Sequence, residues 1–133
     1  MKISAKLKNS FNEHYLEVAT NGATRNVQIP PKPTGYGSDI NGGEMLLLAL
    51  ATCFCNDIYR EAAKKDISVS GVEVNCTADF GAEGEPGSNF QYTVKVSSDS
   101  PKNVIEELIE HTNRIAEIHN TLRIGTAVTL VNS

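Results

Sequence analysis

Residues 41–54 read NGGEMLLLALATCF, and the organisation of the whole chain follows from this stretch. The sequence predicts a long helix over residues 44–65, capped by Asn41 or one of the glycines after it, with Glu44 in its first turn. Residues 45–51 are apolar on every side, which is typical of a central helix that is buried all round. The second half of the helix is amphipathic, and we expect it to emerge into water.

Strands are predicted on both sides of this helix. They cover residues 2–8, 15–19, 26–29, 69–80, 90–96 and 126–131. Asn21-Gly22 is a strong signal for a two-residue hairpin turn, so the first three strands form an antiparallel meander. A second helix starts at Ser100-Pro101, with Ser100 as its cap. The order βββ-α-ββ-α-β lacks alternating βαβ units, so the fold class is α+β and mostly antiparallel.

The composition fits a single globular domain over residues 1–133. Because 12 Lys and Arg residues face 16 Asp and Glu residues, with no basic stretch and no tryptophan, we expect no nucleic-acid partner. The longest apolar run has seven residues, against the roughly 20 that span a bilayer, so no membrane partner is expected. The N-terminal residues lack the apolar run of a signal peptide, and we predict a cytoplasmic location.

The three cysteines, Cys53, Cys55 and Cys76, are too few and too irregularly spaced for a disulfide scaffold. Their odd number leaves at least one free thiol, which suits a reducing compartment. On a helix Cys55 points about 200° away from Cys53, which disfavours both a disulfide and a metal site between them. His14 and His111 are isolated, so we predict neither a metal nor a cofactor.

Residues 41–54 resemble the helix signature of the OsmC/Ohr family, the osmotically induced and organic hydroperoxide resistance proteins. That signature has Asn-Pro, a carboxylate, leucines and alanines, and then a cysteine. Residues 118–122, IHNTL, followed by Gly125, resemble the second motif of the family. The resemblance implies an OsmC-like fold in an intertwined homodimer, with a long buried helix from each chain at its centre. It also implies thiol-dependent reduction of hydroperoxides at the dimer interface.

The resemblance implies a specific set of catalytic residues. One cysteine attacks the peroxide and becomes a sulfenic acid, and a second cysteine resolves it to a disulfide that a dithiol reduces. Cys53 matches the attacking cysteine, and Ala116 stands where the second cysteine belongs. Gly43 occupies the position of the catalytic glutamate, with Glu44 one residue later. The N-terminal arginine has no obvious counterpart, since Arg25 lies elsewhere in the meander.

The environment of Cys53 on an ideal helix includes Asp57 and Arg60. Arg60 would lower the pKa of the thiol and Asp57 would oppose it. Alternatively, Cys53 is a small buried hydrophobic residue without reactivity. Either Cys55 or Cys76 could resolve an oxidised Cys53 if the fold brings it close.

Two further candidates are Glu44 and His119. Glu44 lies on the opposite side of its own helix from Cys53, so only a dimer could bring it to the Cys53 of the other chain. The alternative is that it serves only as a first-turn carboxylate. His119 is three residues beyond Ala116 and could approach the thiol or a ligand, or simply interact with a helix C-terminus.

Two functions follow from these residues. The first is a one-cysteine peroxidase, in which Cys53 reduces an organic or hydrogen peroxide and an external thiol reduces the sulfenic acid. The alternative is an OsmC-like dimer that holds an apolar small molecule at its interface without turnover, in a pocket that includes Phe54 and Tyr36. Cys53 favours the first function, and Ala116 favours the second.

Overall fold

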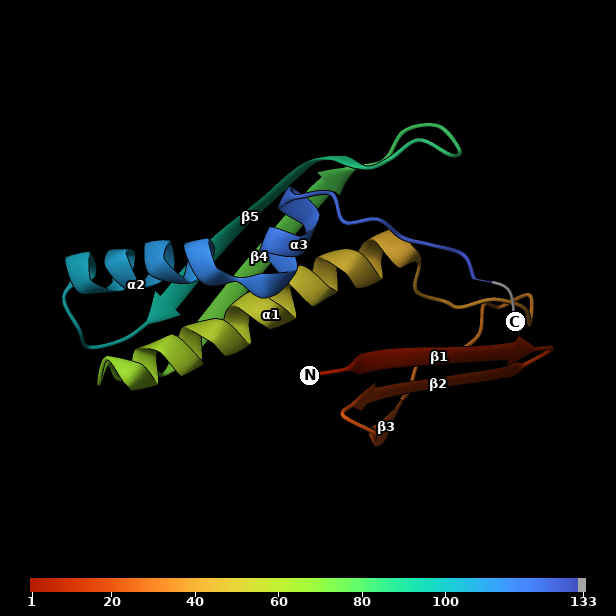
Figure 1. Ribbon diagram of the computed structural model, residues 1–133, viewed down its shortest axis with the longest axis horizontal. Helices are drawn as coiled ribbons and strands as arrows, with labels where there is room; N and C mark the ends of the chain where they lie inside the picture. The colour runs from red at the N-terminus through yellow and green to blue at the C-terminus, as the bar shows by residue number, and fades with distance from the viewer. Residues whose placement is uncertain (132–133) are drawn as a thin grey trace. The chain divides into compact units, whose positions relative to one another are not determined.

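The computed structural model describes residues 1–131. The contacts divide the chain into two compact parts, one formed by Met1–Met45 and the other beginning at Leu46 (Figure 1). Strands and helices are both present, and all strand pairs are antiparallel, which confirms the predicted α+β class. Within the described residues, no helix is both long enough and apolar enough to cross a membrane.

The first part contains the predicted meander. Its strands are β1 (Ile3–Ser10), β2 (Glu13–Thr20) and β3 (Ala23–Val27), in the spatial order β1-β2-β3. Asn21 and Gly22 join β2 to β3 with φ angles of 49° and 83°. A two-residue hairpin turn of the type that matches strand twist requires positive φ at both positions, and Asn-Gly meets this requirement best. The local sequence therefore explains this hairpin.

The helix α1 (Gly42–Lys64) begins with the predicted cap. The side-chain oxygen of Asn41 accepts a hydrogen bond from the backbone N–H of Glu44 at 2.8 Å. In return the Glu44 carboxylate accepts one from the backbone N–H of Asn41 at 3.0 Å. Such a reciprocal capping box satisfies two backbone donors that have no partner within the helix.

The second part is built on a β-hairpin. Strands β4 (Gly71–Asp79) and β5 (Ser88–Ser97) pair with Val74 opposite Val94. Helices α1 and α2 (Lys102–Ile115) pack on one face of this hairpin (Figure 1). The core between them contains completely or almost completely buried residues from both helices and the segment after α2: Phe54, Ile58, Ala62, Leu108 and Ala116.

In the single chain the second half of α1 is amphipathic, as predicted, and the apolar first half, which we expect a second copy to cover, is the more exposed half. Met45 and Leu48, in the apolar first half, are 39% and 56% exposed in the single chain. Phe54 and Ile58, further along, are completely buried. The hairpin and α2 pack against one face of the second half, and the opposite face is exposed.

The region after β5 departs from the prediction at two points. Pro101, and not Ser100, is the N-cap residue of α2, and no side-chain cap is formed. The helix then breaks at Ala116, whose backbone is extended (φ −64°, ψ 109°), and α3 (Glu117–Arg123) begins in a new direction. The expected single helix is therefore two.

The last strand of the predicted order βββ-α-ββ-α-β is not present. Residues 126–131 form no ladder with any strand in the described part of the chain, and Val128 and Leu130 are 100% and 96% exposed. A strand needs a partner edge to satisfy its backbone N–H and C=O groups. Within one chain this segment has none, so its β-favouring sequence is not sufficient.

Candidate functional site

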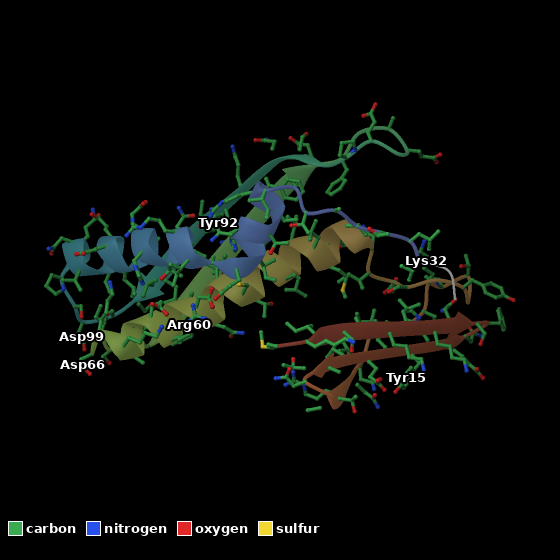
Figure 2. The ribbon with its side chains drawn as sticks, viewed as in Figure 1. Tyr15, Lys32, Arg60, Asp66, Tyr92 and Asp99 are labelled. Atoms are coloured by element: carbon green, nitrogen blue, oxygen red, sulfur yellow. The ribbon has the colours of Figure 1, made fainter. Side chains whose placement is uncertain are left out.

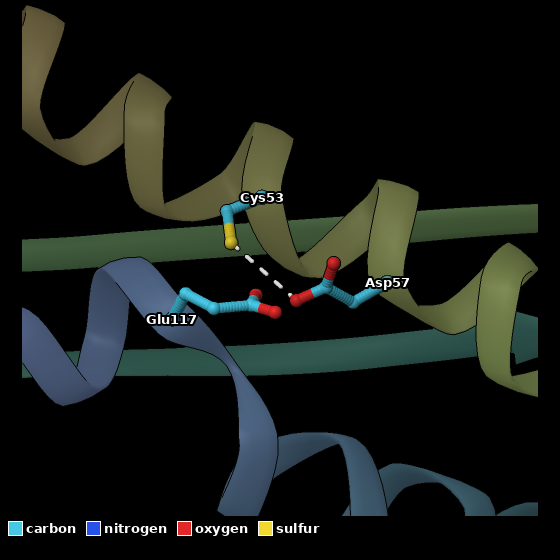
Figure 3. A group of neighbouring side chains, drawn as sticks. All are labelled: Cys53, Asp57 and Glu117. Atoms are coloured by element: carbon cyan, nitrogen blue, oxygen red, sulfur yellow. Dashed lines mark hydrogen bonds between the residues drawn. The ribbon is translucent and has the colours of Figure 1, made fainter. Parts of the chain in front are cut away.

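Three side chains meet beside α1 in the second part of the chain (Figure 3). The Cys53 thiol donates a hydrogen bond to the Asp57 carboxylate, with 3.4 Å between Sγ and Oδ2. The Glu117 carboxylate joins them from α3, and one ligand atom from each residue lies within 4.8 Å of the other two. Asp57 is 5% exposed, whereas the side chain of Glu117 is 65% exposed. The cluster therefore has a buried side and an open side.

Local backbone geometry explains this grouping. Cys53 and Asp57 are four residues apart on one helix, so their side chains lie one above the other on the same face. Glu117 is brought to them by the extended backbone at Ala116, which ends α2 and starts α3. The cluster thus depends on the four-residue spacing of Cys53 and Asp57 and on the end of helix α2 at Ala116.

The positive charge of Arg60 partly balances the negative charges of Asp57 and Glu117. Its guanidinium nitrogen Nη1 lies 3.1 Å from Asp57 and 3.5 Å from Glu117, and its Nε donates to Glu61 at 2.8 Å. Figure 2 labels Arg60 on α1. We expected Arg60 to lower the pKa of the Cys53 thiol, but the guanidinium is bound to carboxylates instead. The positive charge of Arg60 therefore partly balances the carboxylates around the thiol.

The electrostatics of the cluster favour a protonated thiol. Burial raises the pKa of Cys53, and the nearby charges of Asp57 and Glu117 raise it further, although the backbone of Ile118 acts in the opposite direction. Burial also raises the pKa of Asp57, while its hydrogen bond with Cys53 and the charge of Arg60 oppose that shift. A carboxyl group with a raised pKa is a better proton acceptor than an ordinary aspartate.

The same three residues are the group in the described chain that could hold a metal ion. A thiolate and two carboxylates are suitable ligands for a divalent cation. However, Asp57 and Glu117 already have a cationic partner in Arg60, so their charge does not require an ion. The geometry therefore favours proton transfer between Cys53 and Asp57 over metal binding.

The other candidates from the sequence lie in different surroundings. The Glu44 carboxylate takes part in the capping box, which is the structural role that the sequence also allowed. Ala116 is completely buried in the core. Phe54, which we expected in the wall of an apolar pocket, is also completely buried. Cys55 lines a shallow hollow against Val72 and Val74 of β4.

His119 is 4% exposed and lies in α3. Its ring is 5.5 Å from the ring of Phe54 and 4.8 Å from that of Tyr92, between centroids. Neither ring nitrogen has a hydrogen-bond partner in the protein. Burial lowers the pKa of His119, and the charge of Arg123 adds to this effect, so the imidazole is neutral near pH 7. No hydrogen bond joins it to Cys53 among the described residues.

The sequence of the chain matches a known family. A family model described as OsmC-like protein matches residues 35–131. The chain belongs to this family. A search of curated proteins found no match, so the remaining comparisons are with solved structures.

Three solved structures illustrate the likeness of this OsmC-like chain to others. An OsmC-like protein of Mycoplasma pneumoniae has 21% identity and a TM-score of 0.63, with 92% of this chain and 86% of that chain covered. An organic hydroperoxide resistance protein OsmC of Legionella pneumophila has 19% identity and a TM-score of 0.60, with coverage of 92% and 90%. The organic hydroperoxide resistance protein OhrB of Bacillus subtilis has 13% identity and a TM-score of 0.56, with coverage of 94% and 93%. At these identities the likeness shows a shared fold.

Sequence reasoning missed part of the site in this OsmC-like protein. It treated Asp57 only as a charge opposing the thiolate, whereas the structure makes it the hydrogen-bond acceptor of the thiol. It did not identify Glu117 at all. The four-residue spacing from Cys53 to Asp57 was a usable signal. In contrast, nothing in the sequence around Glu117 indicates the helix break that brings Glu117 near Cys53.

Proposed function

We propose that this protein is a one-cysteine thiol peroxidase, in which Cys53 reduces an organic or hydrogen peroxide. The observation that supports the proposal most directly is the hydrogen bond from the Cys53 thiol to Asp57. A thiol becomes nucleophilic when it loses its proton, and Asp57 is placed to accept that proton. Cys53 is only partly buried, so a small molecule can approach it. The names of the Legionella and Bacillus proteins point to the same substrate class.

In the first half-reaction, Asp57 takes the thiol proton and the Cys53 sulfur attacks the terminal oxygen of ROOH. The O–O bond breaks, and its electron pair leaves on the alkoxide. Asp57 returns the proton to this oxygen, so the products are ROH and the sulfenic acid of Cys53. The sulfur is oxidised and the peroxide is reduced, and Asp57 is regenerated as a carboxylate.

In the second half-reaction, an external thiol R′SH attacks the sulfenic sulfur, and water leaves. A second R′SH then attacks the mixed disulfide, which releases R′SSR′ and restores the Cys53 thiol. We propose that this external thiol takes the place of a second cysteine, because Ala116 stands where the resemblance places that cysteine. Free thiols at all three cysteines are consistent with a reducing location, and we infer that the protein acts in the cytoplasm.

The formation of the sulfenic acid can be observed directly. After cumene hydroperoxide is added to the protein at pH 7.5 (a chosen assay condition, about one unit below a free thiol's pKa), dimedone should label Cys53, as seen by peptide mass spectrometry. The Cys55→Ser and Cys76→Ser variants should be labelled at Cys53 as the wild type is. Labelling that is absent from Cys53 in folded protein, or that appears equally on all three cysteines, would contradict the peroxidase proposal.

A second candidate is a non-catalytic module that binds an apolar small molecule. Two observations favour it: Ala116 is buried in the core at the position of the second cysteine, and the surroundings raise the pKa of the Cys53 thiol. In that case Cys53 would resist both peroxide and alkylating reagents in folded protein. The same labelling experiment therefore separates the two candidates.

We further propose that the protein forms a homodimer, in which α1 of each copy covers the other. The support is the exposure of Met45 and Leu48 at 39% and 56%, because apolar side chains gathered on one helix face usually have a partner. Only in such a dimer could Glu44 reach a Cys53, that of the second copy. Sedimentation velocity at micromolar protein concentration should show a dimer. A stable monomer at that concentration, or a dimer that the Leu48→Glu variant leaves intact, would refute this arrangement.

A further inference from the structure

The group of charged side chains beside the thiol carries more negative than positive charge. Arg60 pairs with three carboxylates, those of Asp57, Glu61 and Glu117, at 3.1, 2.8 and 3.5 Å. Lys64 pairs with Glu61 at 2.9 Å, which leaves Asp57 and Glu117 to share one guanidinium. Among the described residues, no second cation forms an ion pair with either of these two carboxylates. A net negative charge therefore remains next to the thiol.

This negative charge lies where a molecule from solution reaches Cys53. Oδ2 of Asp57 is 3.4 Å from Sγ, and one ligand atom each of Cys53, Asp57 and Glu117 lies within 4.8 Å of the other two (Figure 3). Asp57 is 5% exposed and the side chain of Glu117 is 65% exposed, so an incoming molecule approaches beside Glu117. These distances are shorter than the Debye length of about 8 Å at physiological ionic strength, so salt screens the charges only in part.

We infer that the Cys53 site discriminates against anions, so that the external thiol that reduces oxidised Cys53 is neutral or cationic. The second part of this inference rests on the peroxidase proposal, because it concerns the second half-reaction. At that stage the carboxylates of both Asp57 and Glu117 are present, since the first half-reaction returns the proton of Asp57 to the alcohol product.

The chemistry of the second half-reaction explains why the charge of the reductant matters. The thiolate R′S⁻ attacks the sulfenic sulfur of Cys53, an S–S bond forms, and the S–O bond breaks. The hydroxyl group leaves as water with the proton that R′SH lost. The attacking sulfur is already negative, so a carboxylate on the same molecule adds repulsion from Asp57 and Glu117. An ammonium group instead offsets the charge of the thiolate.

Three thiols of similar size test the assignment of the reductant: cysteamine is cationic, 2-mercaptoethanol is neutral and 3-mercaptopropionate is anionic. After oxidation by cumene hydroperoxide and removal of the excess, mass spectrometry follows mixed disulfide formation at Cys53. Each rate is divided by the thiolate concentration and by the rate of the same thiol with a neutral model disulfide, which removes differences in nucleophilicity. The corrected rates should fall in the order cysteamine, 2-mercaptoethanol, 3-mercaptopropionate, by about fivefold at each step.

A second measurement tests the discrimination without any peroxide. The reduced Cys53 thiolate attacks the sulfenyl sulfur of a methanethiosulfonate, forms a disulfide with it and releases methanesulfinate. Reagents with a trimethylammonioethyl, a methyl and a sulfonatoethyl group are compared at one pH, with modification of Cys53 counted by peptide mass spectrometry. Each rate is divided by that of the same reagent with free 2-mercaptoethanol. The cationic reagent should again be fastest and the anionic reagent slowest.

Two variants show whether Glu117 is a source of this preference. Glu117→Gln removes one of the two carboxylates and should lower the ratio of cationic to anionic rates by about fivefold. Glu106→Gln is the matched control, because its side chain is 64% exposed and lies about two and a half turns before the end of α2. The ratio should be the same in Glu106→Gln as in the wild type.

The outcomes separate this inference from the peroxidase proposal. If no sulfenic acid forms at Cys53, the peroxidase proposal fails, and the methanethiosulfonate rates still test the discrimination against anions. Equal corrected rates for the three methanethiosulfonates, or a fastest anionic reagent, would overturn the inference whether or not the sulfenic acid forms. An equal change in the Glu106 and Glu117 variants would also overturn it. If the sulfenic acid forms and 3-mercaptopropionate reduces it as fast as cysteamine does, the assignment of the reductant is wrong.

Discussion

Replacement of Phe54 by alanine is expected to lower the free energy of unfolding by about 3–5 kcal/mol, which is the usual cost of removing a buried phenylalanine ring. Phe54 is completely buried at the centre of the core of the second part. Its ring packs at 5.0 Å from that of Tyr92 and 5.5 Å from that of His119, so the loss includes specific aromatic contacts. A domain of this size is stable by only about 5–15 kcal/mol, so this one change removes a large share.

Urea denaturation at one fixed protein concentration would measure this loss, because dimerisation would make stability depend on concentration. Phe80→Ala is a matched control. Phe80 is 54% exposed, so the same chemical change there should cost less than about 1 kcal/mol. If the two variants lost similar stability, or if Phe54→Ala lost less than Phe80→Ala, the core would not lie where the structure places it.

Signals that are local in the sequence predicted the fold well. Asn21-Gly22 specifies its hairpin because both residues tolerate positive φ. Asn41 and Glu44 specify the start of α1 because each side chain reaches the other's backbone N–H. In both cases the atoms that determine the structure are within four residues of one another, so no tertiary information is needed.

Features that depend on distant contacts were not predictable in the same way. The break at Ala116 occurs in a segment, residues 102–123, that contains neither glycine nor proline. Ala116 at the break and His119 after it lie in the interior, at 0% and 4% exposure. The segment 126–131 has a β-favouring sequence but pairs with no strand among the described residues. Propensity cannot supply the missing neighbour.

Only one part of the candidate site, the pairing of Cys53 with Asp57, was predictable from the sequence. The pairing of Cys53 with Asp57 follows from the helical period, because residues four apart share a face. Glu117 comes from a different helix, and its approach depends on the break at Ala116. His119, which we expected could approach the thiol, lies instead against the rings of Phe54 and Tyr92.

Asp57→Asn is expected to change the two reactions of Cys53 in opposite directions. Asparagine has almost the same shape but no charge, so the pKa of the Cys53 thiol should fall, and its thiolate fraction near pH 7 should rise. In wild type, alkylation by iodoacetamide should rise with pH to a midpoint above the ordinary thiol value of about 8.5, because the surroundings raise the pKa. In the variant that midpoint should move to lower pH.

Peroxide reduction should respond differently if Asp57 transfers the proton. The leaving alkoxide needs the proton that Asp57 holds, and asparagine cannot carry it. Acid–base catalysis of this kind typically contributes about a hundredfold or more, so the rate of cumene hydroperoxide reduction should fall by about that factor. Faster alkylation together with slower peroxide reduction would separate a proton carrier from a charge that merely suppresses the thiolate.

Glu117→Gln provides the matched control for this pair of measurements. It also removes a negative charge that raises the thiol pKa, but Glu117 is not the hydrogen-bond acceptor of the Cys53 thiol. Alkylation should therefore accelerate in both variants, whereas peroxide reduction should be retained in Glu117→Gln and lost in Asp57→Asn. If Asp57→Asn instead accelerated both reactions, Asp57 would act only as a negative charge beside the thiol, and the proton would have to come from another donor.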